Sequence, residues 1–187
     1  MLELKAALDR LTLNSDTVDP IIHLPAYFSH TTGDIESALA GLVLAPLKHD
    51  GTVVREEITL RPGNAISRLS GLEAVSEAVS HHAGFGPEPE IERFVFRYGP
   101  GQAVPEHQDH WRHAIVVMGY WGRFSGGAYV YRSLTGREEE VPLSRGDLLL
   151  CFNSVSDGRV FRPIHRVAPI DSGIRWVVAH SHVIRRI

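Results

Sequence analysis

His107, Asp109 and His165 are the residues of this sequence whose types are best suited to hold a transition metal. Two histidines and one carboxylate can occupy one face of an octahedral ferrous ion and leave three positions open. An oxygen-activating enzyme needs those positions to hold a co-substrate and O2 side by side. Arg175, ten residues after His165, could grip a carboxylate through two hydrogen bonds. The four residues predict a non-haem iron site with an anchor for the far end of a dicarboxylate.

The His107-Gln-Asp109 spacing is weak evidence when taken alone. With 11 histidines and nine aspartates in 187 residues, one such match arises by chance about half the time. On a strand, however, residues 107 and 109 project to the same face, ~6.6 Å apart along the chain. The pair follows a predicted strand and the turn Gly99-Pro-Gly101, and His165 begins the last predicted hairpin. These positions favour convergence at the mouth of a barrel.

Four other histidines near the predicted site are not expected to bind the same metal: His110, His113, His180 and His182. The first has the opposite strand parity to Asp109, and the second would lie ~13 Å beyond Asp109 on a continuous strand. The last two differ in parity from Arg175, which favours outward or packing positions.

Five residues around the site keep two interpretations. His110, Trp111 and Arg112 either shape a substrate opening or support the loop that carries the ligands. Arg159 and Arg162, in the loop before His165, either meet an anionic group of the substrate or lie on a solvated loop.

The elements that must position these residues change in character near residue 90. Before it, apolar spacing predicts helices over 4–11, 35–47 and 71–83. The last of these follows a Ser70-Gly-Leu-Glu73 capping box and ends before Gly84. After residue 90 the pattern predicts short strands over 91–98, 114–121, 128–132, 147–152 and 175–184. Such strands, with helices collected at the N-terminal end, favour a β-sandwich or barrel buttressed by helices.

Composition narrows the class of protein. A length of 187 residues with 43% hydrophobic content fits one domain with a substantial core, and the net charge of −3 offers no footprint for nucleic acid. No apolar stretch approaches the ~20 residues that span a bilayer, and the N-terminus lacks the features of a signal peptide. Cys151 is the only cysteine and lies in an apolar run, which predicts a buried, inert thiol. We therefore expect a cytoplasmic protein that does not bind membranes.

Four segments, in order, resemble a known family. Residues 96–109, Phe-Arg-Tyr-Gly-Pro-Gly-Gln-Ala-Val-Pro-Glu-His-Gln-Asp, resemble the entry motif of the Fe(II)/2-oxoglutarate-dependent oxygenases, and most of all their prolyl 4-hydroxylase-like branch. Ser125-Gly-Gly-Ala128 is similar to the family's Gly-Gly strand, and residues 141–147 to its Pro-x-x-Gly-Asp turn. Residues 165–176 resemble the distal segment, which has a histidine and a basic residue ten positions apart.

The resemblance implies a fold and a set of roles. The fold would be mainly β with N-terminal helices: a double-stranded β-helix, that is, a jelly-roll or cupin-like barrel, buttressed by helices. Residues 1–187 would form one oxygenase domain, with helical support and substrate-side elements in 1–90 and the metal-binding barrel core in 91–187. His107, Asp109 and His165 would bind Fe(II). Arg175 would pair with the 5-carboxylate of 2-oxoglutarate, and Tyr98 would donate a hydrogen bond to it.

The implied activity is hydroxylation of a C–H bond with O2 and 2-oxoglutarate, releasing succinate and CO2. The carboxylate ligand argues against halogenation, which needs that coordination position for a halide. Three alternatives stay open: a nucleic-acid base-oxidising or dealkylating member of the same superfamily, a cupin-like isomerase or dioxygenase that uses the metal without 2-oxoglutarate, and a non-enzymatic, cupin-like β-barrel binding protein. The substrate could be a free amino acid, a small metabolite or an exposed protein side chain, and the sequence leaves the oligomeric state open.

Overall fold

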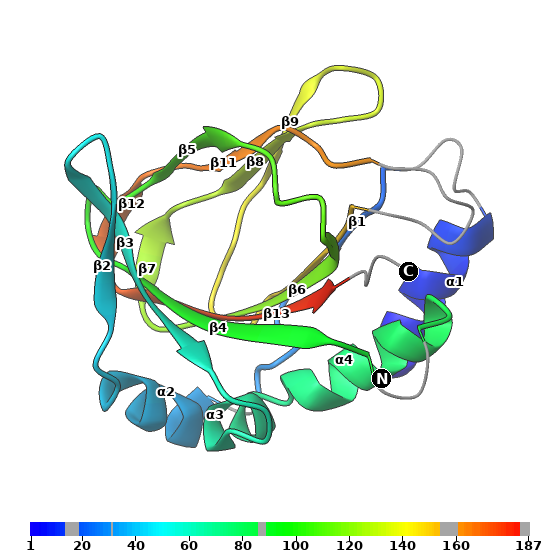
Figure 1. Ribbon diagram of the computed structural model, residues 1–187, viewed down its shortest axis with the longest axis horizontal. Helices are drawn as coiled ribbons and strands as arrows, with labels where there is room; N and C mark the ends of the chain where they lie inside the picture. The colour runs from blue at the N-terminus through cyan, green and yellow to red at the C-terminus, as the bar shows by residue number, and fades with distance from the viewer. Residues whose placement is uncertain (14–18, 31, 86–88, 154–160, 184–187) are drawn as a thin grey trace.

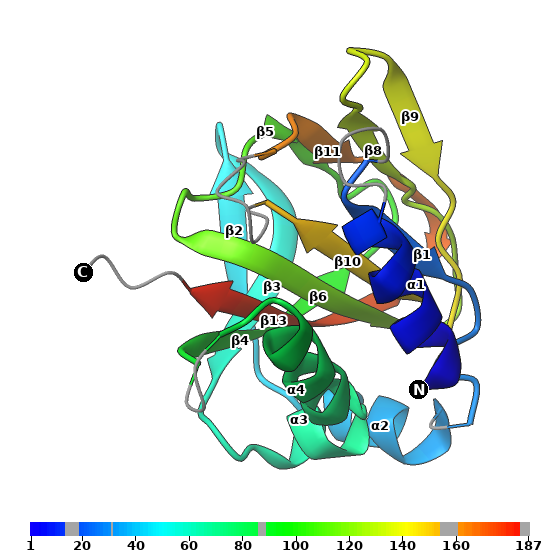
Figure 2. The same ribbon diagram turned by 90° about the vertical axis from the view of Figure 1, so that its right-hand side faces the viewer.

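Two β-sheets face each other across the interior, and helices cover the outer face of the larger sheet (Figures 1 and 2). The computed structural model describes residues 1–13, 19–30, 32–85, 89–153 and 161–183. The larger sheet is antiparallel and has the order β1 (Ile21–Leu24), β10 (Leu148–Phe152), β6 (His113–Trp121), β13 (Arg175–Val183), β4 (Ile91–Tyr98), β3 (Thr52–Leu60) and β2 (Ala45–His49).

The opposite sheet is smaller and carries the residues singled out above. Its order is β5 (Val104–His107), β11 (His165–Val167), β8 (Tyr129–Arg132) and β9 (Glu138–Val141). A two-stranded ribbon joins β12 (Ile170–Gly173) to β7 (Phe124–Gly126). The predicted mainly β, jelly-roll architecture with N-terminal helices is confirmed, although hydrogen bonds among the described strands do not close the two sheets into one barrel.

The helices are α1 (Leu2–Leu13), α2 (Thr32–Ala40), α3 (Ala65–Leu69) and α4 (Leu72–His82). Their apolar faces pack on the larger sheet, where Leu4, Leu72 and Val79 join a core with Trp121 and Val178. Burying such side chains stabilises the fold by about 1.5–3 kcal/mol each. Within the described residues, no helix has the length and apolar character needed to cross a membrane.

Strand β13 lies at the centre of the larger sheet and is buried along its whole length. Because side chains alternate along a strand, Trp176 and Val178 face the helices. Arg175, Val177 and Ala179 instead line the space between the sheets. The sheet therefore separates a helix-packed core from an inner cavity.

The helix predicted over 35–47 is wrong in its second half, because α2 ends at Ala40 and residues 45–49 form β2. Pro46 has no backbone N–H to donate within a helix and also disfavours the helical conformation of the residue before it. The next turn, at Asp50 and Gly51, has φ values of 50° and 82°. Positive φ at both positions is typical of a tight hairpin, and β2 pairs with β3 through it. Residues 1–90 thus supply strands as well as helices.

Helix α4 confirms the prediction for 71–83, but its N-terminus does not form the predicted capping box. Gly71, with φ of 75°, occupies the N-cap position, and the Ser70 hydroxyl accepts a hydrogen bond from the Leu72 amide at 3.3 Å. The carboxylate of Glu73 turns instead to Arg93 on β4, at 3.0 Å. An ion pair between helix and sheet has replaced the local cap.

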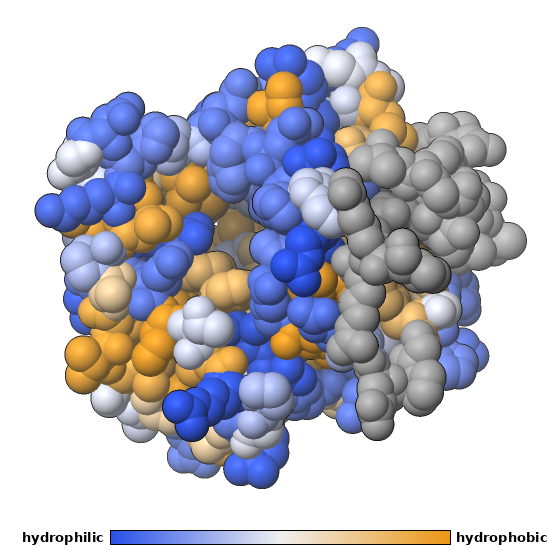
Figure 3. Space-filling model, in the orientation of Figure 1, coloured by the Kyte–Doolittle hydropathy of each residue, from blue (hydrophilic) through white to orange (hydrophobic). Residues whose placement is uncertain are grey.

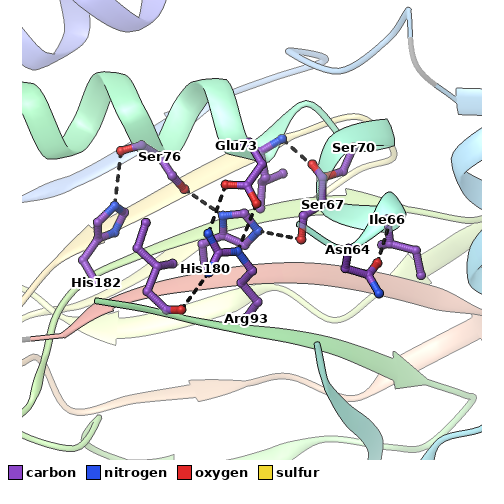
Figure 4. A network of polar contacts seen from close by, with 11 residues as sticks. Asn64, Ile66, Ser67, Ser70, Glu73, Ser76, Arg93, His180 and His182 are labelled. Carbon is purple, nitrogen blue, oxygen red and sulfur yellow. Dashed lines mark hydrogen bonds and ion pairs between the residues drawn. The ribbon is translucent and has the colours of Figure 1, made fainter. Parts of the chain in front are cut away.

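Two of the excluded histidines occupy a buried polar cluster between α4 and β13 (Figure 4). His180 lies between two serine hydroxyls, with Nδ1 2.8 Å from Ser76 Oγ and Nε2 3.2 Å from Ser67 Oγ. His182 Nε2 lies 3.3 Å from the Ser76 carbonyl oxygen. Both side chains are fully buried on the helix side of the sheet, so the packing role expected from their parity is confirmed.

This cluster predicts a loss of stability in acid. Burial lowers the pKa of His180 to about 4, whereas an unfolded histidine has a pKa of about 6.5. The unfolded chain therefore binds the proton first, and stability present above pH 6.5 is lost as the pH falls toward 4, by on the order of 2–3 kcal/mol. Urea unfolding at about pH 7 and about pH 4.5 should show a smaller loss in His180→Asn than in the wild type. The exposed-site control His49→Asn should behave like the wild type, and an equal loss in both variants would contradict the assignment.

Candidate metal centre

His107 and His165 are brought together by pairing of two short strands. His107 ends β5, His165 begins β11, and the two residues lie directly opposite each other in the antiparallel register. Their ring centroids are 4.3 Å apart. Asp109 lies beyond the end of β5, so the expectation that both early ligands share one continuous strand is wrong. The turn after His107 nevertheless returns the Asp109 carboxylate to the two rings.

The three side chains form a compact donor set. One ligand atom from each of His107, Asp109 and His165 lies within 4.8 Å of the other two. His165 Nε2 is 3.7 Å from Asp109 Oδ1. In the part of the chain that the structure describes, these residues form the group of histidine and carboxylate side chains close enough to share one ion. Two imidazoles and one carboxylate suit a divalent transition metal such as iron better than a hard oxygen-seeking cation.

Backbone carbonyls orient both imidazole rings. His107 Nδ1 lies 2.9 Å from the Pro105 carbonyl oxygen, and His165 Nδ1 lies 3.0 Å from that of Pro163. A proton on Nδ1 donates in each pair, which leaves the Nε2 lone pair toward the centre of the cluster. Burial lowers the pKa of His165, and the neighbouring Asp109 only partly opposes this shift. Neutral rings with inward lone pairs are what a metal ligand requires.

Asn153 and Arg162 hold the third candidate ligand, Asp109, in place. Asn153, buried just after β10, donates its amide hydrogen to Asp109 Oδ2 at 3.0 Å and to the His113 carbonyl oxygen at 3.0 Å. Arg162 donates to the Asp109 backbone carbonyl oxygen from Nε at 3.2 Å. Arg162 therefore supports the ligand-bearing turn, a role that neither of its two predicted interpretations included. Arg159 lies outside the described residues.

Removal of the Asn153 amide should weaken metal binding without unfolding the protein. Outer-sphere partners of metal ligands typically contribute about 10–100-fold to affinity, so we expect Asn153→Ala to bind Fe(II) about tenfold more weakly. Anaerobic calorimetry measures the dissociation constant directly. Gln108→Ala is the matched control, since Gln108 lies between the two early ligands but is exposed and bonds to the Arg162 carbonyl oxygen. Equal affinities for the two variants would contradict the orienting role of Asn153.

Arg175 lies at the other end of the cavity, almost completely buried at the start of β13. Its guanidinium carbon is 4.3 Å from the centroid of the Tyr98 ring, and the two residues are opposite each other in the β13–β4 register. Nη1 donates a hydrogen bond to the Gly127 carbonyl oxygen, while Nε has no hydrogen-bond partner among the described residues. The described acidic side chains form no ion pair with this arginine. A buried cation without a counter-ion is costly and favours an anionic ligand.

Gly127 makes room for this arrangement. Its φ is +72°, and a Cβ there would lie 2.6 Å from Arg175 Nη1 and 2.3 Å from Ile170 Cδ1. Only glycine fits such a conformation and such a close approach. The Gly-Gly motif singled out from the sequence thus holds the backbone against the arginine.

A cavity of about 190 Å³ joins the two ends of the site. The three candidate ligands lie on its small-sheet side, and Arg175 and Tyr98 lie on its large-sheet side. Apolar side chains, including Val116, Leu143 and Val177, make up much of its wall. Figure 3 shows the molecule hollowed near the middle of the face seen in Figure 1, with apolar surface inside the hollow. The arrangement can hold a small dianion between a metal and a guanidinium.

The remaining candidates lie around the donor set. His113 begins β6 and lines the cavity, but its Nε2 lies 3.0 Å from Glu92 Oε2. The prediction of one continuous strand from Asp109 to His113 is wrong, because β5 ends at His107 and β6 begins at His113. His113 nevertheless lies outside the donor group, as expected. His110 and Trp111 lie on the turn after Asp109, with ring centroids 5.3 Å apart.

Arg112 belongs to the same surface turn as Trp111, and its guanidinium pairs with Glu90 at 3.3 Å. Cys151 is buried, as predicted, and burial raises the pKa of its thiol to about 12. That shift keeps it protonated and inert.

Sequence reasoning missed two residues that line the cavity, Arg55 and Glu57 on β3. The Asp50–Gly51 pair between two β-prone segments was the signal that could have found them, because that dipeptide is a strong hairpin indicator. A hairpin over 45–60 would have placed alternate residues of its second strand on the face that turns inward.

This architecture is the fold of the 2-oxoglutarate-dependent Fe(II) oxygenases, as similarity to solved structures demonstrates. The chain is similar to a prolyl-4-hydroxylase from Pseudomonas putida, with 20% identity, a TM-score of 0.69, and coverage of 98% of this chain and 100% of the other. It is also similar to a Trichoplax adhaerens prolyl hydroxylase solved with a hypoxia-inducible-factor peptide fragment, with 12% identity, a TM-score of 0.69, and coverage of 97% and 89%. A third neighbour is the non-haem α-ketoglutarate-dependent epimerase SnoN from nogalamycin biosynthesis, with 13% identity, a TM-score of 0.63, and coverage of 95% and 82%. No protein-family model and no curated protein sequence matches the chain.

Proposed function

We propose that the protein is an Fe(II)- and 2-oxoglutarate-dependent dioxygenase, most of all a hydroxylase of a C–H bond. The observation that carries the proposal is one cavity with a His107–Asp109–His165 donor set at one end and, at the other, the buried Arg175, which forms no ion pair with a described carboxylate. When bound, iron would supply the redox chemistry that couples O2-dependent decarboxylation of 2-oxoglutarate, to succinate and CO2, with oxidation of the substrate. The donor set fits that metal by ligand type, distance and ring orientation.

The chain's own residues would act by binding, orienting and excluding water. The two histidines and Asp109 would hold the metal. Arg175 grips the distal carboxylate of 2-oxoglutarate, and Tyr98 donates a hydrogen bond to the same group. The apolar wall keeps water from the guanidinium, which strengthens its attraction for the carboxylate.

Three kinds of substrate fit this proposal. One solved neighbour holds a peptide fragment, and another is an epimerase from nogalamycin biosynthesis, so an amino acid, a small metabolite or a protein side chain are all candidates. A nucleic-acid substrate is disfavoured by the net charge of −3. The proposal treats residues 1–187 as one oxygenase domain, with residues 1–90 as support and substrate-side elements.

Anaerobic titration with Fe(II) and then 2-oxoglutarate tests the proposal. We expect one equivalent of metal to bind, and a visible charge-transfer band to appear when the 2-oxo acid chelates it. Succinate release across a panel of amino acids, metabolites and peptides would then identify the substrate class. No metal binding would refute the enzyme. Metal binding without a response to 2-oxoglutarate would favour the cupin-like alternative.

A further inference from the structure

Arg55 is a second arginine in the cavity, and its surroundings differ from those of Arg175. It lies on β3, in the hairpin that follows Asp50–Gly51, and its side chain is 20% exposed. Its guanidinium carbon lies 4.1 Å from the centroid of the Phe96 ring on β4. The planar group is therefore held flat on an aromatic side chain, which restricts its orientation.

The charge of Arg55 is already compensated. Its Nε donates to Glu57 Oε2 at 3.0 Å, and its Nη2 lies 2.9 Å from the same oxygen. Arg175, by contrast, has no ion-pair partner among the described carboxylates. A dicarboxylate entering the cavity thus meets one unpaired cation and one neutral pair. The pair adds hydrogen-bond donors beside the co-substrate pocket without adding net charge.

The β3–β4 register, in which Glu56 is opposite Arg97, brings Arg55 beside Tyr98, and both side chains line the cavity. Burial lowers the pKa of Arg55, but the interactions with Tyr98 and Glu57 raise that pKa by more, so the pKa lies above its usual value. On the other side of β4, the β13–β4 register places Arg175 opposite Tyr98. The Tyr98 side chain therefore lies between Arg55 on β3 and Arg175 on β13.

The contact has a defined direction, because a guanidinium can only donate hydrogen bonds. In a hydrogen bond between the two side chains the Tyr98 oxygen would accept from Arg55, which would leave its own O–H hydrogen for another acceptor. The guanidinium carbon of Arg175, on β13, lies 4.3 Å from the centroid of the Tyr98 ring. A carboxylate held by Arg175 is the acceptor that completes this arrangement.

We propose that Arg55 is a positioning residue for the co-substrate: with Glu57 as its counter-ion, it orients the Tyr98 hydroxyl toward the distal carboxylate of 2-oxoglutarate. This inference rests on the proposed function. It also assigns the β2–β3 hairpin a part in co-substrate selection, since the hairpin supplies both members of the pair.

Direct binding tests the proposal without turnover. The Zn(II)-loaded protein, which is redox-inert, is titrated calorimetrically with 2-oxoglutarate and with 2-oxobutanoate, which has the same chelating end but no distal carboxylate. We expect Arg55→Met and Tyr98→Phe each to weaken 2-oxoglutarate binding about tenfold, as loss of one hydrogen bond to a charged group would. The double variant should be no weaker than Tyr98→Phe alone, and Arg55→Lys should recover part of the loss. All variants should bind 2-oxobutanoate equally well.

The control is Arg97→Met, since Arg97 lies next to Tyr98 on β4, pairs with Glu56 and projects away from the cavity. It should leave both affinities unchanged. An unchanged 2-oxoglutarate affinity in Arg55→Met, or additive losses in the double variant, would overturn the positioning role. A wild-type protein that binds neither 2-oxo acid would instead refute the proposed function, so the two failures are distinguishable.

Discussion

Replacement of His107 by alanine is expected to abolish Fe(II) binding at physiological concentrations, with a loss of affinity of more than about a hundredfold. Losses of 10–100-fold are typical when an outer-sphere partner of a ligand is removed, and removal of a ligand itself must exceed them. Among the described residues, three side chains form the donor set. The two that remain cannot hold the metal against water. The charge-transfer band expected with 2-oxoglutarate should vanish with the metal.

The His107 experiment has a close control in His110→Ala. His110 lies three residues further on, is exposed, and is outside the donor group. It should keep the wild-type metal affinity. Thermal unfolding of both variants without metal shows whether His107→Ala remains folded, which we expect because the His107 side chain is only half-buried. Full metal affinity in a folded His107→Ala protein would exclude this site.

Replacement of Arg175 by methionine is expected to move stability and ligand affinity in opposite directions. Affinity for 2-oxoglutarate should fall by about two orders of magnitude, because truncation of one partner of a buried charge pair typically costs about 2–5 kcal/mol. The ligand-free protein should be as stable as the wild type or more so. Exchange of a buried, unpaired charge for an apolar side chain of similar length removes a desolvation cost.

Calorimetry and urea unfolding measure the two effects of the Arg175 substitution separately. Arg132→Met serves as the control, since Arg132 is an exposed arginine at the end of β8. It should change neither quantity. Reduced stability in Arg175→Met together with unchanged 2-oxoglutarate affinity would mean that the arginine is a structural residue and not an anchor.

Much of the candidate site could be predicted from the sequence because its members lie on or next to strands with clear signals. The alternation before Tyr98 and the apolar run around Val178 place β4 and β13 correctly. Parity then separates Arg175 from His180, and the structure puts them on opposite faces of one sheet. Local patterns are reliable where a strand is long and buried on both sides.

What could not be predicted depends on turns and on contacts between distant segments. Asp109 reaches the donor set through a turn fixed by Arg162, which is 53 residues away. Glu73 pairs with a residue on β4 and not with its own helix end. Every residue of β2 is exposed, so no hydrophobic period marks the first strand of the β2–β3 hairpin. Apolar periodicity says little about a strand whose side chains do not pack against a core.

The two faces of β13 determine how substitutions, in evolution or by engineering, would affect the protein. Substitutions on the cavity face, such as at Val177 or Ala179, alter what the pocket accepts, whereas those at Val178 or His180 alter how firmly the helices hold. A backbone layer lies between the two sets, so selectivity and robustness can be adjusted almost independently. An insertion or deletion within the strand has no such freedom. A shift of one residue would exchange the two faces and place Arg175 among the helices.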